Sequence, residues 1–341
     1  MTSWVRVQAP VRVLDAGGWT DTWFSREGAV CHLAVEPGAE AFARVLSACD
    51  PGMAEVQMRV PDFGDHYRFR LDQPPGRHPL LEAALKRWAP QDRSIEVDVR
   101  SAVPAGSSLG TSASVLVALI AALQQLRGPS PSDGPGPLAH AAHDIEAIDL
   151  GRQSGIQDQA AAAFGGANLV TISPYPSFEV RRLDLQPSVW AALADRVLTI
   201  YLGAFHDSSV IHGTVIEHLA GDDNEADRLL SPLRTSAARA AEALLAGDLG
   251  AYGEAMIANT EAQACLHPTL VNPVARRVIE ISEKCGAIGW KVNGAGGEGG
   301  TVTVVTAEDR DELMRALEEV PGLEVLALNP TPWGARVVDQ G

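Results

Sequence analysis

The sequence contains very little lysine and has a large excess of negative charge. Only Lys86, Lys284 and Lys291 are lysines, and 27 basic against 43 acidic residues give a formal net charge of −16. Nucleic-acid-binding proteins usually carry a basic patch, so we expect no nucleic-acid partner. An anionic ligand such as ATP would need positive potential supplied locally, by helix ends, a few arginines or lysines, and Mg²⁺.

Paired cysteines, long apolar runs and a leader pattern are absent as well. Cys31, Cys49, Cys265 and Cys285 show no C-x-x-C spacing, which predicts neither a zinc site nor a redox pair. The longest apolar run, 115–123, is too short to span a bilayer, and the N-terminus has no basic-then-apolar pattern. We therefore expect a reduced, cytoplasmic protein with no membrane partner.

The chain is long for one domain, with 341 residues of which 46% are apolar. Strand patterns followed by helical patterns predict an α+β protein in two parts, with residues 1–190 and 191–341 as the domains. The expected strands are 5–14, 29–35, 41–46, 56–60, 67–71, 94–99, 167–172, 180–185, 196–203, 287–292, 301–305 and 323–328. The expected helices are 80–88, 115–126, 138–150, 157–164, 209–219, 225–246, 249–264, 272–285 and 307–319. A proline-rich loop is expected at 127–137, and the domain boundary is expected near 186–195.

A stretch of small residues carries the first chemical signal. Residues 104–114 read Pro-Ala-Gly-Ser-Ser-Leu-Gly-Thr-Ser-Ala-Ser and lead directly into an apolar helix. The free N–H groups at the start of a helix favour a phosphate, and glycines let the backbone approach it closely. No Gly-Lys-Ser/Thr follows, so this is not the Walker pattern. Taken alone, the stretch fits an anion site or a well-capped buried helix.

Two further glycine-containing stretches, one near each end of the chain, help to interpret that loop. Residues 9–22 read Ala-Pro-Val-Arg-Val-Leu-Asp-Ala-Gly-Gly-Trp-Thr-Asp-Thr, and residues 291–300 read Lys-Val-Asn-Gly-Ala-Gly-Gly-Glu-Gly-Gly. In this order and spacing the three stretches resemble the motifs of the GHMP kinase superfamily, over most of the chain. The resemblance is to the sugar kinase branch that contains D-glycero-D-manno-heptose 7-phosphate kinases and L-fucokinases. It implies an N-terminal domain like domain 2 of ribosomal protein S5 and a ferredoxin-like C-terminal domain.

The resemblance implies an ATP site. Its predicted residues are Pro104, Gly106, Ser107, Ser108, Gly110, Thr111 and Ser112, with Gly294, Gly296 and Gly297 from the third motif. Ser112 and Glu146 match the Mg²⁺ ligands, and Mg²⁺ prefers such oxygen ligands. Each of these two residues could instead cap a helix or face solvent. Glu298 departs from the family pattern, and because a carboxylate repels phosphates, it must face away or pair with a cation.

The resemblance also implies a catalytic pair and an acceptor site. Asp158 matches the family's base, and Arg12 matches the cation that would keep this base ionised. Asp158 could instead only cap a helix, and Arg12 could be an ordinary surface arginine of a strand. The predicted substrate-binding residues are Gly18, Trp19, Asp21 and Gln157, although Trp19 could equally belong to the core. The Glu and His of the galactokinase motif are missing, so galactose contacts are not inferred.

The resemblance implies an ATP-dependent kinase that phosphorylates a sugar or sugar phosphate at the anomeric hydroxyl, giving a sugar 1-phosphate. Phosphoryl transfer needs a phosphate cradle, a metal and an oriented hydroxyl, and the sequence offers residues for each. A uronic acid or a non-sugar alcohol stays open as the acceptor, as does a non-catalytic nucleotide or sugar sensor. A homodimer is also left open.

Overall fold

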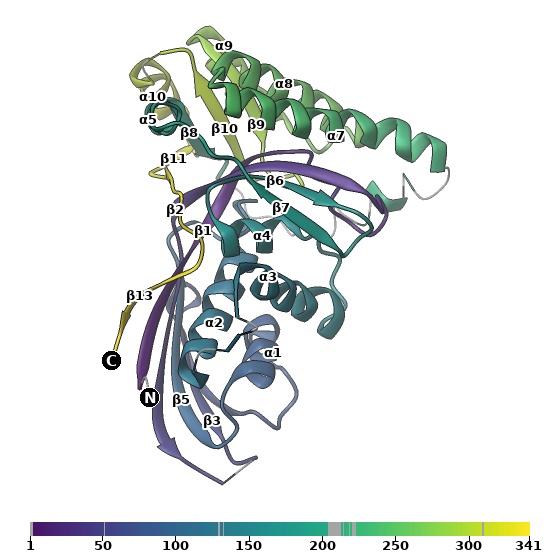
Figure 1. Ribbon diagram of the computed structural model, residues 1–341. Coiled ribbons are helices and arrows are strands. Elements are labelled where there is room, and N and C mark those ends of the chain that lie inside the picture. Colours follow the sequence, from purple (N-terminus) through teal and green to yellow (C-terminus); the bar gives the residue numbers. More distant parts are fainter. Residues whose placement is uncertain are drawn as a thin grey trace.

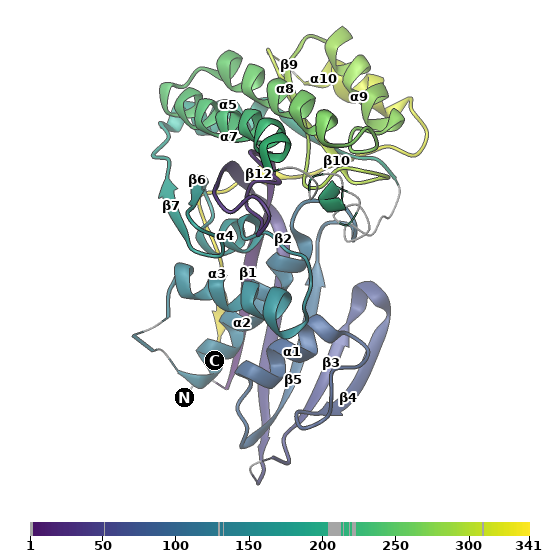
Figure 2. The same cartoon turned by 90° about the vertical axis from the view of Figure 1, so that its right-hand side faces the viewer.

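The structure is a computed structural model and describes residues 3–341 apart from 51, 129, 132, 204–212, 214, 218, 220–222 and 309. It has two halves (Figures 1 and 2). A large sheet with helices on one face forms the lower half, and a smaller sheet with long helices forms the upper half. The two chain ends meet in the lower half, where the backbone N–H of Trp4 donates to the carbonyl of Gly341 at 3.1 Å.

The large sheet has nine strands in the described chain and is mostly antiparallel. They are β1 (Trp4–Ala16), β2 (Gly28–Ala48), β3 (Glu55–Val60), β4 (Asp65–Arg70), β5 (Arg93–Ser101), β6 (Ala167–Ile172), β7 (Phe178–Arg182), β12 (Asn329–Pro330) and β13 (Arg336–Gln340). Six run in the order β13–β1–β2–β5–β3–β4, β6 and β12 pair with β2, and β7 pairs with β6. β3 and β5 are parallel.

β2 joins two segments that the sequence predicts as separate strands, 29–35 and 41–46. Glu36-Pro37-Gly38 would ordinarily end a strand, yet here it lies inside one. The backbone stays paired on both sides of this point, because Ala39 faces Ala9 of β1 and Ser101 of β5. The prediction of two strands is therefore wrong, and pairing with neighbouring strands is the reason.

Helices cover one face of this sheet. They are α1 (Pro79–Trp88), α2 (Thr111–Arg127), α3 (Pro135–Asp144) and α4 (Gln157–Phe164), with a π-helical turn at Ile145–Asp149 and a 3₁₀ turn at Pro61–Phe63. α2 begins four residues earlier than predicted, which places Ser112 in its first turn. Leu116, Leu119 and Ile120 of α2 are fully buried between the sheet and the other helices. The apolar run of the sequence is thus a core helix.

The upper half contains a four-stranded sheet in the order β11–β8–β10–β9. Its strands are β8 (Val197–Tyr201), β9 (Ala287–Val292), β10 (Thr301–Thr306) and β11 (Glu324–Leu326), and its helices are α5 (Pro187–Arg196), α7 (Asp223–Ala246), α8 (Leu249–Leu266), α9 (Pro273–Lys284) and α10 (Asp311–Glu318). α5 occupies the segment in which the sequence predicts the domain boundary and no helix. The predicted helix 209–219 lies mostly outside the described residues.

One apolar cluster joins the two halves. Val11 and Leu33 of the large sheet pack in it with Leu244 of α7 and Tyr252 and Met256 of α8. α7 and α8 lie side by side over the upper end of the large sheet (Figure 2). This contact fixes β1, which carries the first motif, against the upper half.

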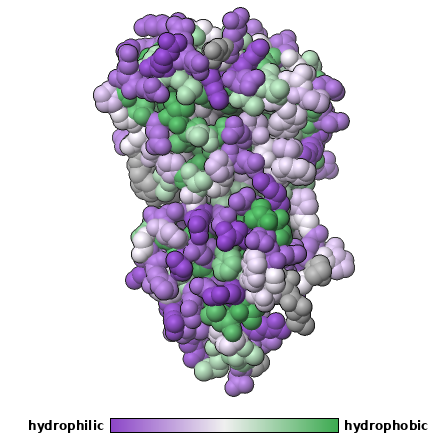
Figure 3. All heavy atoms as spheres, turned by 90° about the vertical axis from the view of Figure 1, so that its left-hand side faces the viewer, coloured by the Kyte–Doolittle hydropathy of each residue, from purple (hydrophilic) through white to green (hydrophobic). Residues whose placement is uncertain are grey.

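The last two strands return to the large sheet. β13 pairs with β1 and β12 with β2, although the predicted domain 191–341 includes both. The division at residue 190 itself stays a prediction. Hydrophilic side chains cover most of the face seen in Figure 3, and hydrophobic ones form separate patches on it. Dimerisation stays a prediction as well.

Candidate active site

The glycine-serine loop 104–110 lies directly in front of α2. Gly110 caps this helix with φ +74°, a left-handed conformation that glycine adopts without strain. The loop is fixed on β1, because the backbone N–H of Arg12 donates to the carbonyl of Leu109 at 3.0 Å. The free N–H groups of the first turn of α2 therefore start beside β1.

A cleft of about 1300 Å³ opens over this loop. The predicted residues that line it are Arg12, Trp19, Asp21, Pro104, Gly106, Ser107, Ser108, Gly110, Thr111, Ser112, Glu146, Gln157, Asp158 and Gly294. Segments from the start, middle and end of the chain thus share one cleft. Gly18, Gly296 and Gly297 do not line it. The roles of all these residues remain predictions.

Asp158 and Arg12 form an ion pair at the cleft wall. Asp158 lies in the first turn of α4, and its Oδ1 accepts from Nε of Arg12 at 2.8 Å. The Arg12 side chain is 4% exposed and that of Asp158 is 30% exposed, so the carboxylate faces the cleft and the guanidinium lies behind it. Nη1 of Arg12 also donates to the carbonyl of Ser108, which joins the pair to the loop.

Arg12 is fully charged in this setting. Burial alone would lower the pKa of Arg12, but attraction to Asp158, Asp15 and Asp21 outweighs it and raises that pKa. The Arg12 guanidinium therefore stays in place as a cation and hydrogen-bond donor beside the Asp158 carboxylate, whose other face is open to the cleft.

Ser112 and Glu146 face each other across the start of α2. Oγ of Ser112 lies 3.5 Å from Oε1 of Glu146, while Ser154 and Gln159 donate to Oε2 at 3.1 and 2.8 Å. Burial raises the pKa of Glu146, and Asp158 adds to this effect. A hydroxyl and a fixed carboxylate oxygen, both lining the cleft, fit the oxygen ligands that Mg²⁺ prefers.

Asp21 and Gln157, two of the predicted substrate-binding residues, lie next to each other in the cleft lining. The backbone N–H of Gln157 donates to Oδ2 of Asp21 at 3.0 Å. Only glycine fits at position 155, since a Cβ there would lie 2.0 Å from the same oxygen. Burial raises the pKa of Asp21 to about 6, and Asp158 contributes to the rise. Trp19 also lines the cleft and packs in an apolar cluster of the upper half, so it belongs to the core, and its contact with a sugar stays a prediction.

The third motif packs beside the loop through only part of its length. The backbone N–H of Gly294 donates to the carboxylate of Asp15, and Oγ1 of Thr301 donates to the carbonyl of Ser107 at 2.8 Å. Gly297 instead donates its N–H to Leu270 at 3.1 Å, which is behind the cleft wall. Glu298 is exposed and does not line the cleft. It faces away, as the sequence required.

Sequence reasoning missed a group of apolar side chains that line the cleft. Val60, Phe63, Leu80, Leu81 and Val103 line it, from β3, the 3₁₀ turn, α1 and the segment after β5. The sequence predicts a hairpin and a helix here but contains no motif that sends them to the cleft. Asp15 and Lys291 were also missed, although each lies within one of the quoted motifs.

Comparison with known proteins identifies the family. The chain matches the GHMP kinases N terminal domain over residues 79–166 and the GHMP kinases C terminal domain over residues 240–322. It is 30% identical to the mevalonate kinase of Methanothermobacter thermautotrophicus over 240 residues, which are 67% of this chain and 73% of that protein. The chain belongs to the GHMP kinases.

Two further similarities concern heptose kinases. This GHMP kinase is 26% identical to a D-glycero-alpha-D-manno-heptose 7-phosphate kinase of Campylobacter jejuni, over 71% of its own length and 70% of the relative's. A crystal structure of a D-glycero-D-manno-heptose 1-phosphate kinase from Bacteroides thetaiotaomicron superposes with a TM-score of 0.74, at 22% identity, covering 98% of this chain and 99% of that one. The predicted two-domain GHMP kinase fold is confirmed. GHMP kinases use ATP as the phosphoryl donor, so the enzyme is an ATP-dependent kinase of an alcohol group.

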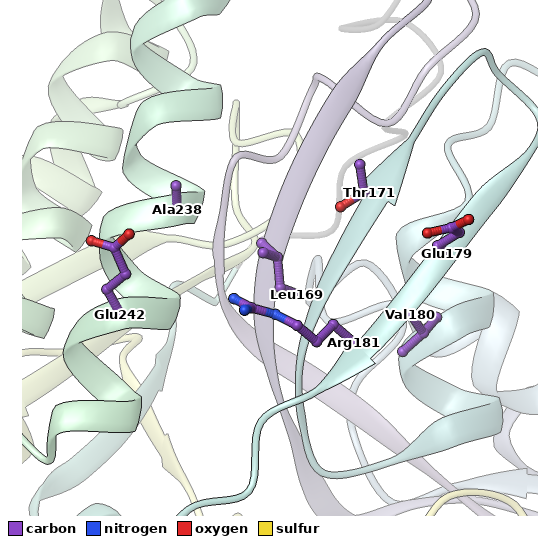
Figure 4. Close-up of a pocket in the computed structure, with 7 residues that line it drawn as sticks. All are labelled: Leu169, Thr171, Glu179, Val180, Arg181, Ala238 and Glu242. Carbon is purple, nitrogen blue, oxygen red and sulfur yellow. The ribbon is translucent and has the colours of Figure 1, made fainter.

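A smaller cavity of about 470 Å³ lies away from the motifs, between β6, β7 and α7 (Figure 4). Arg181 extends from β7 toward α7, which carries Ala238 and Glu242. None of the predicted site residues lines this cavity, so we assign the active site to the larger cleft. Among the described residues there is no helix able to cross a membrane and no cluster of three or more His, Cys, Asp or Glu able to hold a metal ion.

Proposed function

We propose that this GHMP kinase transfers the γ-phosphoryl group of ATP to a sugar or sugar phosphate, at the anomeric hydroxyl, and so forms a sugar 1-phosphate. One observation carries the proposal: the cleft-facing carboxylate of Asp158 is held by Arg12 at 2.8 Å, directly beside the cap of the loop helix α2. The similarity to heptose kinases supports a sugar acceptor.

ATP would lie along the cleft with its phosphates at the loop. The N–H groups at the start of α2 and the positive end of its dipole would bind the β- and γ-phosphates. The apolar side chains of the lining, among them Val60, Phe63 and Leu80, would contact the base. This orientation places the γ-phosphate near Asp158, because Gly110 at the helix cap contacts that side chain.

Mg²⁺ would be held by Oγ of Ser112 and Oε1 of Glu146, with phosphate oxygens and water as the other ligands. When bound, it neutralises phosphate charge. Ser154 and Gln159 hold the other oxygen of Glu146, which fixes the direction of the free one.

In the proposed reaction the phosphoryl group passes to the sugar oxygen, and the proton of that hydroxyl passes to Asp158. The sugar oxygen forms a bond to the γ-phosphorus while the bond from that phosphorus to the β–γ bridging oxygen breaks and ADP leaves. The hydroxyl proton passes to Asp158. Arg12 stabilises Asp158 before the transfer and the developing negative charge on the sugar oxygen during it.

Asp21 and Gln157 would orient the acceptor. Both are buried in the cleft floor, and Oε1 of Gln157 has no partner in the described chain. A carboxylate and an amide oxygen accept hydrogen bonds from adjacent hydroxyls, which sugars supply. The ring of Trp19, also at the wall, offers an apolar surface to a sugar face.

Arg152 favours an acceptor that carries a second, negatively charged group. It lines the cleft, is exposed, and its side chain makes no hydrogen bond or ion pair within the described residues. Arg12 and Arg77, the other arginines of the cleft, are both paired with carboxylates. A sugar phosphate or a uronic acid would therefore gain a charge partner that a neutral sugar lacks.

A panel of acceptors with ATP tests the proposal. It should contain each sugar both free and phosphorylated, uronic acids, and non-sugar alcohols such as mevalonate. Phosphorus NMR of the product then locates the new phosphate. We expect turnover with a sugar phosphate and a signal from an anomeric phosphate. Binding of ATP without turnover on any acceptor would instead favour a sensor.

A further inference from the structure

Four buried or half-buried charges of alternating sign form a chain behind the cleft wall. Asp158 faces the cleft, Arg12 follows at 2.8 Å, Asp15 lies 3.8 Å from Nη2 of Arg12, and Nζ of Lys291 lies 3.5 Å from Asp15. The side chains of Asp15 and Lys291 are 0% and 1% exposed. Neither of these two lines the cleft, so neither touches substrate directly.

Asp15 lies between two cations and is held in place from one side. Its carboxylate accepts the backbone N–H of Gly294 at 3.0 and 3.2 Å, so the third motif fixes its position. A buried carboxylate needs such partners, because burial without them is strongly unfavourable. The attraction of Asp15 for Arg12 therefore acts from a fixed point, on the side of the guanidinium away from the cleft.

Lys291 belongs to β9 in the upper half and has its own fixed partners. Nζ donates to Oε1 of Gln263 in α8 at 2.8 Å and to the carbonyl of Val292. Burial lowers the pKa of Lys291, and Asp15 opposes this by stabilising the charged form. In a chain with only three lysines, one is thus placed behind the catalytic pair.

We propose that Asp15 and Lys291 are positioning residues, which hold the guanidinium of Arg12 so that its Nε faces Asp158. Without the charge of Asp15, Arg12 keeps Asp158 and the Ser108 carbonyl as partners but loses the attraction from behind. Its guanidinium can then turn or move toward the phosphates. Lys291 balances Asp15, so Asp15 does not draw Arg12 away from Asp158. This inference rests on the proposed function of Arg12 and Asp158.

The test uses the double variant D15N/K291M of the full chain. The amide that replaces the Asp15 carboxylate still accepts the N–H of Gly294, and the methionine that replaces Lys291 fills most of the lysine volume. No single buried charge is then left unpaired. K291M alone leaves Asp15 short of one partner and serves as the folding comparison. Tyr252→Phe is the matched control, because the Tyr252 hydroxyl is buried near Asp15 and has no hydrogen-bond partner among the described residues.

Two measurements are made on each variant. We expect D15N/K291M to lose about 10–100-fold in kcat, as supporting residues around a reactive group typically do, with the KM for ATP within about twofold of wild type. We expect its crystal structure to show Arg12 displaced from the 2.8 Å contact with Asp158. The control Y252F should keep both kcat and the position of Arg12.

The outcomes separate this inference from the proposed function. If Arg12 stays in its contact, or if kcat stays at the wild-type level, the positioning role is wrong. If Asp15 and Lys291 are needed only for folding, K291M should lose activity because the Asp15 carboxylate lacks a partner. The double variant, in which that charge is removed, should then recover the activity. If the wild-type enzyme phosphorylates no acceptor at all, the proposed function fails, whereas the position of Arg12 still tests the charge chain.

Discussion

Asp158 is the side chain on which the proposed chemistry depends most directly. We expect Asp158→Asn to lose at least ~10²-fold in kcat, since positioned acid–base groups typically contribute ~10²–10⁴-fold. The amide keeps the size of the carboxylate, and the loop that would bind ATP is untouched. Steady-state kinetics and calorimetric titration with ATP measure the two effects separately.

Asp149→Asn is the control for that variant. Asp149 lies in the π-helical turn after α3, is partly exposed, and pairs with Arg87 at 3.4 Å outside the cleft. Exposed pairs contribute little to stability, so both kcat and ATP affinity should match the wild-type enzyme. Wild-type turnover in D158N would remove Asp158 from the mechanism.

Asp21, the proposed acceptor-binding carboxylate, should make the stability of the fold depend on pH. Its pKa is about 6 in the folded protein and about 3.9 in an unfolded chain. Between these values the folded state binds more protons, so stability decreases as the pH rises from about 4 to about 6. At ~1.4 kcal/mol per pH unit this gives about 3 kcal/mol. We therefore expect Asp21→Asn to be more stable than wild type by up to that amount at pH 7 and by nothing near pH 4.

Urea unfolding at the two pH values measures this difference. The same variant should raise the KM for the acceptor, because an amide accepts hydrogen bonds from hydroxyls less strongly than a carboxylate does. A variant that is no more stable at pH 7 would show that Asp21 is not destabilising when ionised. An unchanged KM would place the acceptor elsewhere in the cleft.

Among individual residues, the sequence predicted those that line the cleft better than those that lie behind its wall. Arg12, Asp158, Ser112 and Glu146 come together as the order and spacing of the motifs indicate. Asp15 and Lys291 could not be found in this way, because an ion pair between residues 276 positions apart depends on how β1 and β9 pack. The only feature of the sequence that pointed to Lys291 was the small number of lysines in the chain.

Among the elements, α2 brings the loop and Asp158 together, and Gly110 is the point of contact. A Cβ at Gly110 would lie 3.0 Å from Cγ of Asp158, and the residue has φ +74°. We expect Gly110→Ala to displace Asp158 and lower kcat by at least ~10-fold, since small misplacements of reacting groups are costly. Kinetics of the purified variant measure this.

Gly128, the cap at the other end of α2, provides the comparison. It has φ +99°, and a Cβ there would meet no atom of the described chain within 4 Å. Gly128→Ala should lower stability by about 1 kcal/mol through backbone strain while kcat stays unchanged. Equal losses of kcat in the two variants would mean that α2 strain, and not contact with Asp158, explains the effect.

Most elements follow from local sequence patterns, and the exceptions have tertiary causes. The helices 225–246, 249–264 and 272–285 are found close to their predicted bounds, because each has a long periodic pattern. Glu36-Pro37-Gly38 was expected to end a strand, but pairing with β1 and β5 keeps β2 continuous. α5 was missed since only Val189 and Leu193 of it are buried, too few to show a period.

In the whole molecule, the C-terminal segment crosses back from the upper half and contacts α4, the helix that carries the proposed catalytic residue Asp158. The N–H of Ala335 donates to the carbonyl of Ala162 at 2.9 Å, that of Gly166 donates to Thr331 at 3.0 Å, and that of Thr331 donates to Ala34 at 3.0 Å. Residues 331–335 therefore join the C-terminal end of α4 to β2. β13 beyond them pairs only with β1 in the described chain.

Two truncations separate these contributions. Removing residues 336–341 deletes β13 and should lower stability while leaving kcat within about twofold of wild type, because the contacts to α4 remain. Removing residues 329–341 also deletes those contacts, exposes backbone groups at the end of α4, and should lower kcat by ~10-fold or more as Asp158 loses its fixed position. Both are assayed well below their unfolding temperatures, so that loss of folded protein does not enter kcat. If the longer truncation keeps the kcat of the shorter one, the C-terminal segment stabilises the fold without orienting α4.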